Sequence, residues 1–396
     1  MKIYLIGMGC GADSVTQAAG QALAGAGLVL GPRRLLDQVD RRSSECEYRE
    51  AVRPEAIMAQ VSVFTGDRVC ILLSGDSGFY SGARRLGSLL ADYEVEILPG
   101  ISSLQLLAAR LGRPWQDWKL CSAHGVDCDP VAAVCSGQAC FFLTGGHATP
   151  ATLCEQLRDA GLGQLAVIAG EDLGGAKERI LSGTAAEFAV RDFAPLSVLL
   201  AEPAPRYPRR SPGLPDELFF RQDKIPMTKQ EIRAAALSKL AVGPEDICWD
   251  VGAGTGSVSV ELALHGKSVW AVERDAAALE LAEKNREKFG AWNLHLLFGE
   301  APDALVKLPK PDAVFLGGSG GKLREILSAV VAANPSARIC VAAIALETLQ
   351  EACVGFQELG FSAEVTQIAV SRSKAAGSLH LMLAQNPVYL ITGKPS

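Results

Sequence analysis

Residues 250–256, with the sequence Asp-Val-Gly-Ala-Gly-Thr-Gly, restrict the possible folds of this chain more than any other segment. A short apolar run, 247–249, precedes them, and a helical pattern over 258–264 follows, on which Glu261 is expected to face outward. This order of strand, glycine-rich turn and helix lets the backbone adopt positive φ and offers the free N–H groups of a helix start to a ligand. We therefore expect a nucleotide-like cofactor here, with an ordinary tight turn as the alternative.

The next predicted strand, residues 268–272, ends at Glu273, whose carboxylate can accept hydrogen bonds from both hydroxyls of a ribose. A solvated strand end is the alternative. A helix over 276–289 ends before Gly290, and the turn 299–302 beyond the next strand is expected to line an adenine. The G-x-G-x-G spacing differs from the G-x-G-x-x-G of dinucleotide sites. Together, the three features indicate an adenosine-type ligand at the carboxyl ends of the strands.

The composition is that of a soluble protein with large hydrophobic cores, and the 396 residues are enough for two or three domains. Hydrophobic residues make up 48% and charged residues 21%, and the net charge of −6 argues against nonspecific nucleic-acid binding. No apolar run approaches the roughly 18 residues of a membrane span, so no membrane partner is expected. The first residues read as a strand that enters a glycine turn, unlike a signal peptide.

The 11 cysteines are scattered and odd in number, which indicates reduced thiols and a cytoplasmic location. Cys121, His124, Cys128 and Cys135 lie close together in the sequence but match no zinc spacing, so we expect no metal site. A small-molecule substrate and a homo-oligomer are the partners that we expect.

The first half of the chain alternates predicted strands and helices, and its strands end in loops rich in Gly, Ser or Asp. Such loops follow the strands at 2–6, 69–73 and 95–98, and Ser14 is expected to cap the helix that runs to Gly25. Three loops of this kind at the carboxyl ends of strands predict a ligand crevice, whereas one alone would be an ordinary turn. A second α/β block is predicted with strands at 139–143, 165–169 and 196–200.

Proline interrupts residues 204–224 repeatedly, and no periodic apolar pattern survives there. We interpret this stretch as a semi-rigid linker between domains at 1–203 and 225–396. The stretch includes Pro208, Arg209 and Arg210.

The second domain is predicted to form one doubly wound sheet with helices on both faces. An antiparallel pair, 365–370 with 379–383, is expected to close this sheet. The fold class is therefore α/β in both halves of the chain.

Residues from about 225 to 393 resemble the class I S-adenosylmethionine methyltransferases, which have a Rossmann-like sheet. Within that class they are most similar to the family that methylates carbon 15 of a corrin precursor and decarboxylates its ring-C acetate. The motifs that carry the resemblance are 225–229, 231–233, 250–256, 273–274, 299–302 and 317–321. The pattern departs at 342–344, where relatives commonly have a polar residue. The resemblance implies that S-adenosylmethionine binds at Thr228, Gly252, Ala253, Gly254, Thr255, Gly256, Glu273 and Ala301.

The first half resembles the tetrapyrrole methylases, which have a two-lobed fold, through the motifs 7–11, 75–80 and 99–103. Continued through 104–105 and 114–117, the last motif is similar to the branch that methylates carbon 5. This resemblance implies a second cofactor site that includes Gly75, Asp76, Ser102 and Ser103. Both halves in one chain resemble the precorrin-6Y C-5,15-methyltransferase (decarboxylating) family of corrin (cobalamin) biosynthesis, which implies precorrin-6B or its cobalt form as the methyl acceptor.

A methyl group on a sulfonium is already activated, so loops and apolar walls that align the reactants and exclude water suffice for its transfer. No catalytic residue is assigned on this basis. Because the implied substrate carries many carboxylates, Arg372, Arg84 and Arg113 are candidates to orient it, with plain surface charge as the alternative for each. An NAD-dependent oxidoreductase and a noncatalytic tetrapyrrole-binding module are the alternative functions.

Overall fold

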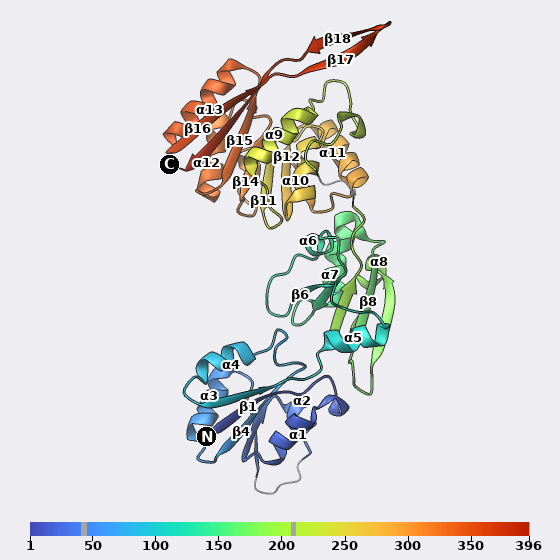
Figure 1. Ribbon diagram of the computed structural model, residues 1–396, viewed down its shortest axis with the longest axis vertical. Helices are drawn as coiled ribbons and strands as arrows, with labels where there is room; N and C mark the ends of the chain where they lie inside the picture. Colours follow the sequence, from blue (N-terminus) through green and yellow to red (C-terminus); the bar gives the residue numbers. More distant parts are fainter. Residues whose placement is uncertain (41–45, 207–210, 396) are drawn as a thin grey trace. The chain divides into compact units, whose positions relative to one another are not determined.

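The computed structural model describes residues 1–40, 46–206 and 211–395, and the chain divides into two compact units. The first unit contains Met1–Val134 and Gln138–Pro203, and the second contains Cys135–Gly137 and Ala204–Ser396. Both units combine strands with covering helices (Figure 1), so the predicted α/β class is confirmed. Pro208, Arg209 and Arg210 of the predicted linker lie outside the described residues.

The first sheet of the first unit is entirely parallel, in the order β3-β2-β4-β1-β5. Its central strands are buried on both faces, which explains why they read as nearly continuous apolar runs. The strands are β1 (Lys2–Gly7), β2 (Leu28–Gly31), β3 (Glu47–Glu50), β4 (Arg68–Leu73) and β5 (Glu94–Leu98). The helices are α1 (Gln17–Ala24), α2 (Arg33–Leu36), α3 (Pro54–Val63) and α4 (Ala83–Leu89).

The predicted cap of the first helix is wrong. Ser14 lies in a short 3-10 helix, η1 (Ala12–Ser14), where its hydroxyl bonds the backbone of Gly11. Helix α1 begins later, and Thr16 caps it by accepting a hydrogen bond from the Ala19 N–H at 3.2 Å. Because Ser and Thr are both good capping residues, the sequence alone did not separate these two positions.

The second sheet of the first unit is mostly antiparallel, in the order β6-β7-β10-β8-β9. Helix α5 (Ser103–Leu111) packs Leu104 and Leu107 against Phe141 and Val198 of this sheet. The strands are β6 (Lys119–Ser122), β7 (Cys140–Leu143), β8 (Ala166–Glu171), β9 (Arg179–Thr184) and β10 (Ser197–Ala201). The other helices are α6 (Pro130–Val134), α7 (Pro150–Leu157), η2 (Arg158–Leu162) and α8 (Ala185–Phe188).

The second unit contains a seven-stranded sheet in the order β13-β12-β11-β14-β15-β19-β16. The chain runs outward from β11 to β13, then returns to place β14 on the other side of β11, so a ligand crevice is expected between β11 and β14. The parallel strands are β11 (Ile247–Val251), β12 (Ser268–Glu273), β13 (Leu294–Phe298), β14 (Ala313–Leu316) and β15 (Arg338–Ala343). The helices are η3 (Asp216–Leu218), α9 (Gln230–Leu240), α10 (Ser257–His265), α11 (Ala276–Phe289), η4 (Asp303–Leu305), α12 (Leu323–Ala333) and α13 (Leu346–Glu358).

The predicted closing pair of this sheet is wrong. Strand β19 (Val388–Pro395) lies antiparallel between β15 and β16 (Phe361–Ile368) and pairs with both. Strands β17 (Ser371–Ala376) and β18 (Leu379–Ala384) form a separate hairpin, which extends away from the sheet (Figure 1). Gly377 adopts φ 62° in its two-residue turn, and such a turn pairs the two strands nearest in sequence.

Three further side chains differ from what the sequence pattern indicated. Leu214 and Phe219, in the stretch interpreted as a linker, are buried in the hydrophobic core of the second unit. Glu261, expected to face outward, is completely buried on α10 and forms an ion pair with Arg233 of α9 at 2.7 Å. A buried carboxylate requires such a partner, because an isolated charge is costly away from water.

Candidate functional site

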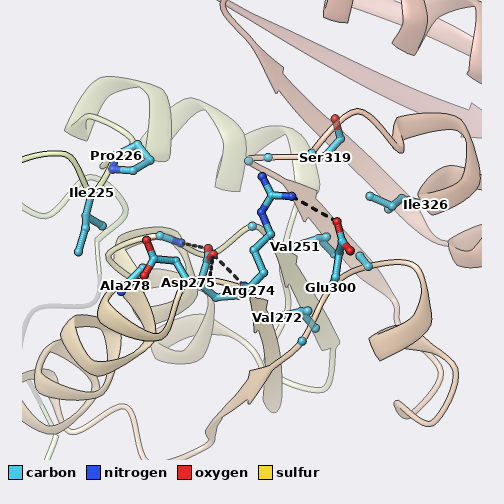
Figure 2. A pocket seen from close by; sticks show the side chains of 18 residues that line it. Ile225, Pro226, Val251, Val272, Arg274, Asp275, Ala278, Glu300, Ser319 and Ile326 are labelled. Carbon is cyan, nitrogen blue, oxygen red and sulfur yellow. Dashed lines mark hydrogen bonds and ion pairs between the residues drawn. The ribbon is translucent and has the colours of Figure 1, made fainter.

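A cavity of about 280 Å³ lies at the carboxyl ends of β11, β12 and β14 in the second unit (Figure 2). Gly252, Gly254, Glu273 and Ala301, all predicted from the sequence, line it. They come from three different loops, each of which follows a parallel strand. The switch point of the sheet therefore brings these residues together.

The glycines of the loop 250–256 are required by close backbone approach. Gly252 has φ 77°, and a Cβ there would lie 2.6 Å from the carbonyl oxygen of Gly318. Gly254 has φ 54°, and its Cβ would lie 2.7 Å from the carbonyl oxygen of Pro226. Neither position admits a side chain without movement of the backbone. The loop is thus in close contact with the segments that contain Gly318 and Pro226, which also line the cavity.

Glu273 joins the end of β12 to this glycine loop. Its Oε2 accepts a hydrogen bond from the Gly254 N–H, and its Oε1 accepts from the N–H groups of Arg274 and Asp275, each at 2.9 Å. A carboxylate has about four acceptor positions, so one remains for a ligand hydroxyl. The residues present therefore fit a ribose-containing cofactor. Arg274 and Glu300, which also line the cavity, form an ion pair at 3.2 Å (Figure 2).

The remaining predicted residues of this site lie outside the cavity. Thr255 is fully buried, and its carbonyl oxygen accepts a hydrogen bond from Asn285. Ala253 belongs to the hydrophobic core, and Gly256 packs on Ala282 of α11. These three residues shape the loop, whereas Thr228 lines a neighbouring cavity.

This neighbouring cavity, of about 510 Å³, shares walls with the first one. Pro226 and the residues 317–319 line both, so ligands in the two cavities would meet across these residues. The rest of its lining is mostly apolar and includes residues 341–344. Lys229 is the single charged side chain among the described residues that line it. Its size and its apolar walls suit a larger, partly hydrophobic ligand.

A cluster of buried charges holds the segment that separates the two cavities. The guanidinium of Arg233, fully buried, donates to Glu261 at 2.7 Å, to Asp216 at 2.9 Å and to the carbonyl oxygen of Thr228. Asp216 also accepts from the N–H of Gln230 at 2.9 Å. The residues just before α9 are therefore fixed by ionic hydrogen bonds.

The sequence analysis missed this cluster, although a signal for it exists. Arg233 precedes Ala236, Leu237 and Leu240 by three, four and seven residues, so the helical period places it on the buried face of α9. A charged residue on a buried stripe predicts an opposite charge nearby. The spacing of the residues did not indicate which carboxylate would pair with Arg233.

Arg372, a predicted substrate contact, lies at the start of the β17–β18 hairpin. Its guanidinium binds Glu231 at 2.6 Å and Asp216 at 3.1 Å. This hydrogen bond from Arg372 holds the pKa of the Glu231 carboxyl below its usual value. Arg372 is not among the residues that line either cavity. In this structure its ion pairs connect the hairpin to the buried charge cluster.

The first unit has its own cavity, of about 880 Å³, lined by loops from both of its sheets. Gly75, Asp76, Ser102 and Ser103, all predicted, line it. The Asp76 carboxylate accepts from the Gly78 N–H at 2.8 Å and from the Gly100 N–H at 3.1 Å. It thereby ties the loop after β4 to the loop after β5.

Close packing and a helix cap hold the second of these loops. A Cβ at Gly100 would lie 2.3 Å from the carbonyl oxygen of Gly75, so the two loops are in direct contact. Ser102 is buried and caps α5 by accepting from the Gln105 N–H at 3.2 Å. The loops after β4 and β5 therefore form one rigid wall.

The arginines of the first unit are placed differently from the prediction. Arg113 pairs with Glu202 at 2.5 Å, and neither Arg113 nor the exposed Arg84 lines the cavity. Arg85 does line it, but pairs with Glu55 at 2.6 Å. The sequence analysis missed Arg34, which lines the cavity and donates to the Ser74 hydroxyl at 3.0 Å.

Asp250, which opens the glycine loop, is fully buried beside the cavity. Burial raises the pKa of its carboxyl from 3.8 to about 7, although a hydrogen bond from the Ser259 hydroxyl opposes the shift. Within the described residues, its Oδ1 has no hydrogen-bond partner. The charged form is therefore disfavoured at this position.

Two properties of the described residues bear on other functions. No group of three or more His, Cys, Asp or Glu side chains is arranged to hold a metal ion there. None of the described helices combines the length and the apolar character that crossing a bilayer requires.

Each half of the chain matches a model of a known protein family. Residues 218–393 match the precorrin methyltransferase domain, and residues 2–189 match the tetrapyrrole (corrin/porphyrin) methylases. The two matches together span both cavities of the second unit and nearly all of the cavity residues of the first.

Individual relatives resemble the whole chain or one part of it. A precorrin-6Y C(5,15)-methyltransferase [decarboxylating] from Sinorhizobium sp is 31% identical over 386 residues, which cover 95% of this chain and 92% of the relative. A probable cobalt-precorrin-6B C(15)-methyltransferase (decarboxylating) from Pyrobaculum calidifontis is 46% identical over 190 residues, 47% of this chain and 97% of the relative. A crystal structure of precorrin-6Y C5,15-methyltransferase from Geobacter metallireducens has 37% identity, covers 48% of this chain and 100% of that chain, and gives a TM-score of 0.45.

Proposed function

Because this chain belongs to the family of precorrin-6Y C(5,15)-methyltransferases (decarboxylating), enzymes of cobalamin biosynthesis, we propose that its two units methylate different carbons of one tetrapyrrole. The second unit, 204–396 with 135–137, methylates carbon 15 and decarboxylates the ring-C acetate. The first unit methylates carbon 5. Two comparisons support this division: the precorrin methyltransferase model matches 218–393 alone, and a relative matched over 190 residues is named for the carbon-15 reaction.

We propose that each unit binds its own S-adenosylmethionine, which supplies a methyl group activated by the sulfonium sulfur. In the second unit, Gly252 and Gly254 let the cofactor approach the backbone, Glu273 accepts from one of its ribose hydroxyls, and Ala301 lies against its adenine. In the first unit, Gly75, Ser102 and Ser103 form the corresponding wall, and Asp76 fixes the two loops that make it.

The residues around the second unit's cavities align the cofactor with the tetrapyrrole. Pro226 and the segment 317–319 separate the cofactor from the tetrapyrrole while letting the two meet at one edge. The apolar lining of the larger cavity excludes water from the reacting groups. Alignment and water exclusion are sufficient for transfer of an activated methyl group.

Membership in this family leaves an NAD-dependent oxidoreductase and a noncatalytic tetrapyrrole-binding module without support. The substrate is a small tetrapyrrole, and assembly into a homo-oligomer stays a prediction.

A turnover assay tests the proposed function. The full chain is supplied with methyl-labelled S-adenosylmethionine and with precorrin-6B, metal-free or cobalt-loaded. We expect label at carbons 5 and 15 and one carbon dioxide released for each label at carbon 15. Label at only one carbon, or methylation without carbon dioxide, would contradict the proposal.

A further inference from the structure

The larger cavity of the second unit contains one uncompensated charge. Among the described residues that line it, only Lys229 is charged, and no ion pair or hydrogen bond joins its ammonium group to another described residue. The other polar groups are neutral, and the remaining walls are apolar. The neutral polar residues are Thr228, Ser319, Thr348, Gln385 and Asn386.

Three other basic side chains near the two cavities are already paired with carboxylates. Arg274 and Lys322 both bind Glu300, at 3.2 and 3.0 Å. Arg372 binds Glu231 at 2.6 Å. Lys229 therefore differs from its neighbours, and its charge is available to a ligand.

The position of Lys229 is not explained by the stability of its helix. Lys229 is the N-cap of α9 and makes no side-chain cap. A cation at this end of a helix is opposed by the helix dipole, which favours anions there. A residue that is unfavourable for the helix but lines a cavity points to a role in binding.

The backbone of Lys229 is held firmly, so its side chain starts from a fixed point. Its carbonyl oxygen accepts from the Arg233 N–H at 2.9 Å, and the preceding carbonyl, of Thr228, accepts from the buried Arg233 guanidinium. The following N–H, of Gln230, donates to the buried Asp216 at 2.9 Å. A site on a rigid element orients its ligand more accurately than one on a loose loop.

A group bound by Lys229 would lie beside the methyl donor. Pro226 precedes Lys229 by three residues and lines both cavities, as does Ser319. Figure 2 shows these two side chains at the smaller cavity. Fixing one edge of a large, flat ligand in the second cavity thus fixes which of its carbons faces the cofactor cavity.

We propose that Lys229 binds a carboxylate of the tetrapyrrole that remains in the product, and that this contact selects the carbon to be methylated. The inference rests on the function proposed for the second unit. An ammonium group carries three donors and matches a single carboxylate. An ion pair with the departing carboxylate would stabilise it against loss of carbon dioxide, so the anchored carboxylate is a retained one. The departing carboxylate lies against the apolar walls.

The test uses the full chain with Lys229→Met, Lys229→Arg and, as a matched control, Lys307→Met. Lys307 is exposed and lines neither cavity. With labelled S-adenosylmethionine and precorrin-6B, K229M should raise the KM for carbon-15 methylation about tenfold to a hundredfold, as loss of a charged hydrogen bond does. Carbon dioxide release should fall in step with methylation. K229R should stay within a few fold of the unchanged protein, and K307M should match it.

Two internal readouts separate this role from a general loss of structure. The variant K229M should keep its carbon-5 methylation and its affinity for S-adenosylmethionine, measured by equilibrium dialysis. An unchanged KM, a loss of cofactor affinity, or a rise of carbon dioxide release relative to methylation in K229M would overturn the role of Lys229 alone. If the protein without any substitution places no label on carbon 15, both the proposed function and this role of Lys229 are overturned.

Discussion

The amide N–H of Gly254 donates a hydrogen bond to Oε2 of Glu273 at 2.9 Å, which joins the loop after β11 to the end of β12. Two features that lie 19 residues apart in the sequence thus form one wall of the proposed cofactor cavity. The carboxylate holds the loop in place and also presents an acceptor to the cavity.

Replacing this carboxylate should therefore affect one cofactor site of two. We expect Glu273→Ala to weaken cofactor binding in the second unit about tenfold to a hundredfold, since a charged acceptor is lost. Equilibrium dialysis should then show one tight S-adenosylmethionine site per chain instead of two. Glu287→Ala, at an exposed position on α11, is the control and should keep both sites. Two unchanged sites in the Glu273 variant would contradict the assignment.

The glycine loop makes a second prediction, about stability. Gly252→Ala places a Cβ 2.6 Å from the Gly318 carbonyl oxygen and at positive φ, so we expect a loss of about 1–3 kcal/mol. Gly87→Ala is the control, because this helical glycine has nothing within 4 Å of the added Cβ. Alanine there should stabilise the helix by about 0.5–1 kcal/mol. Urea unfolding measures the stability of both variants. A Gly252→Ala variant that is as stable as the unchanged protein would argue against close packing at Gly252.

The buried charge cluster predicts an asymmetry between two arginines. Arg233→Met leaves Glu261 buried without its cation and removes one of the two cations that bind Asp216, so it should cost about 3–5 kcal/mol. Arg324→Met removes an exposed pair with Glu358 and should cost less than about 1 kcal/mol. Unfolding in urea compares the two variants. Similar losses would mean that the cluster does not hold the second unit together.

Asp250 predicts a pH dependence whose sign follows from its raised pKa. In the folded chain its carboxyl has a pKa of about 7 instead of 3.8, because burial disfavours the charged form. Its protonated form therefore contributes stability in full below about pH 4, and this contribution is lost as the pH rises through about 7. The loss amounts to at most roughly 4 kcal/mol. In Asp250→Asn the free energy of unfolding should lose this slope, and an unaltered slope between pH 4 and 7 would count against the buried carboxyl.

Local signals in the sequence were sufficient for much of this fold. The helix predicted over 276–289 has these bounds in the structure, because Asp275 caps its start and Gly290 adopts φ 58° at its end. The glycine loop and Glu273 were likewise placed correctly, since both lie where a parallel strand ends. Such features depend on a few neighbouring residues.

Nonlocal partners were not accessible in the same way. The pairing of β16 with β19 passes over the whole β17–β18 hairpin, and no spacing rule selects it over a shorter connection. Arg233 lies on the buried stripe of α9, but its partner Glu261 is 28 residues away on another helix, and no spacing rule pairs the two. The burial of Thr255 depends on the backbone conformation of the loop, which the residue types of the glycine motif do not specify.

The central claim is that one chain contains two independent methyl-transfer sites. Its most direct test compares Gly254→Ala and Asp76→Ala in the full chain, with labelled S-adenosylmethionine and precorrin-6B. Gly254→Ala forces a Cβ against Pro226, and Asp76→Ala releases the Gly78 and Gly100 N–H groups. We predict that the first variant loses label at carbon 15 and carbon dioxide release but keeps carbon-5 methylation, and that the second shows the reverse. Loss of both methylations in either variant, with the other unit still folded, would contradict the claim.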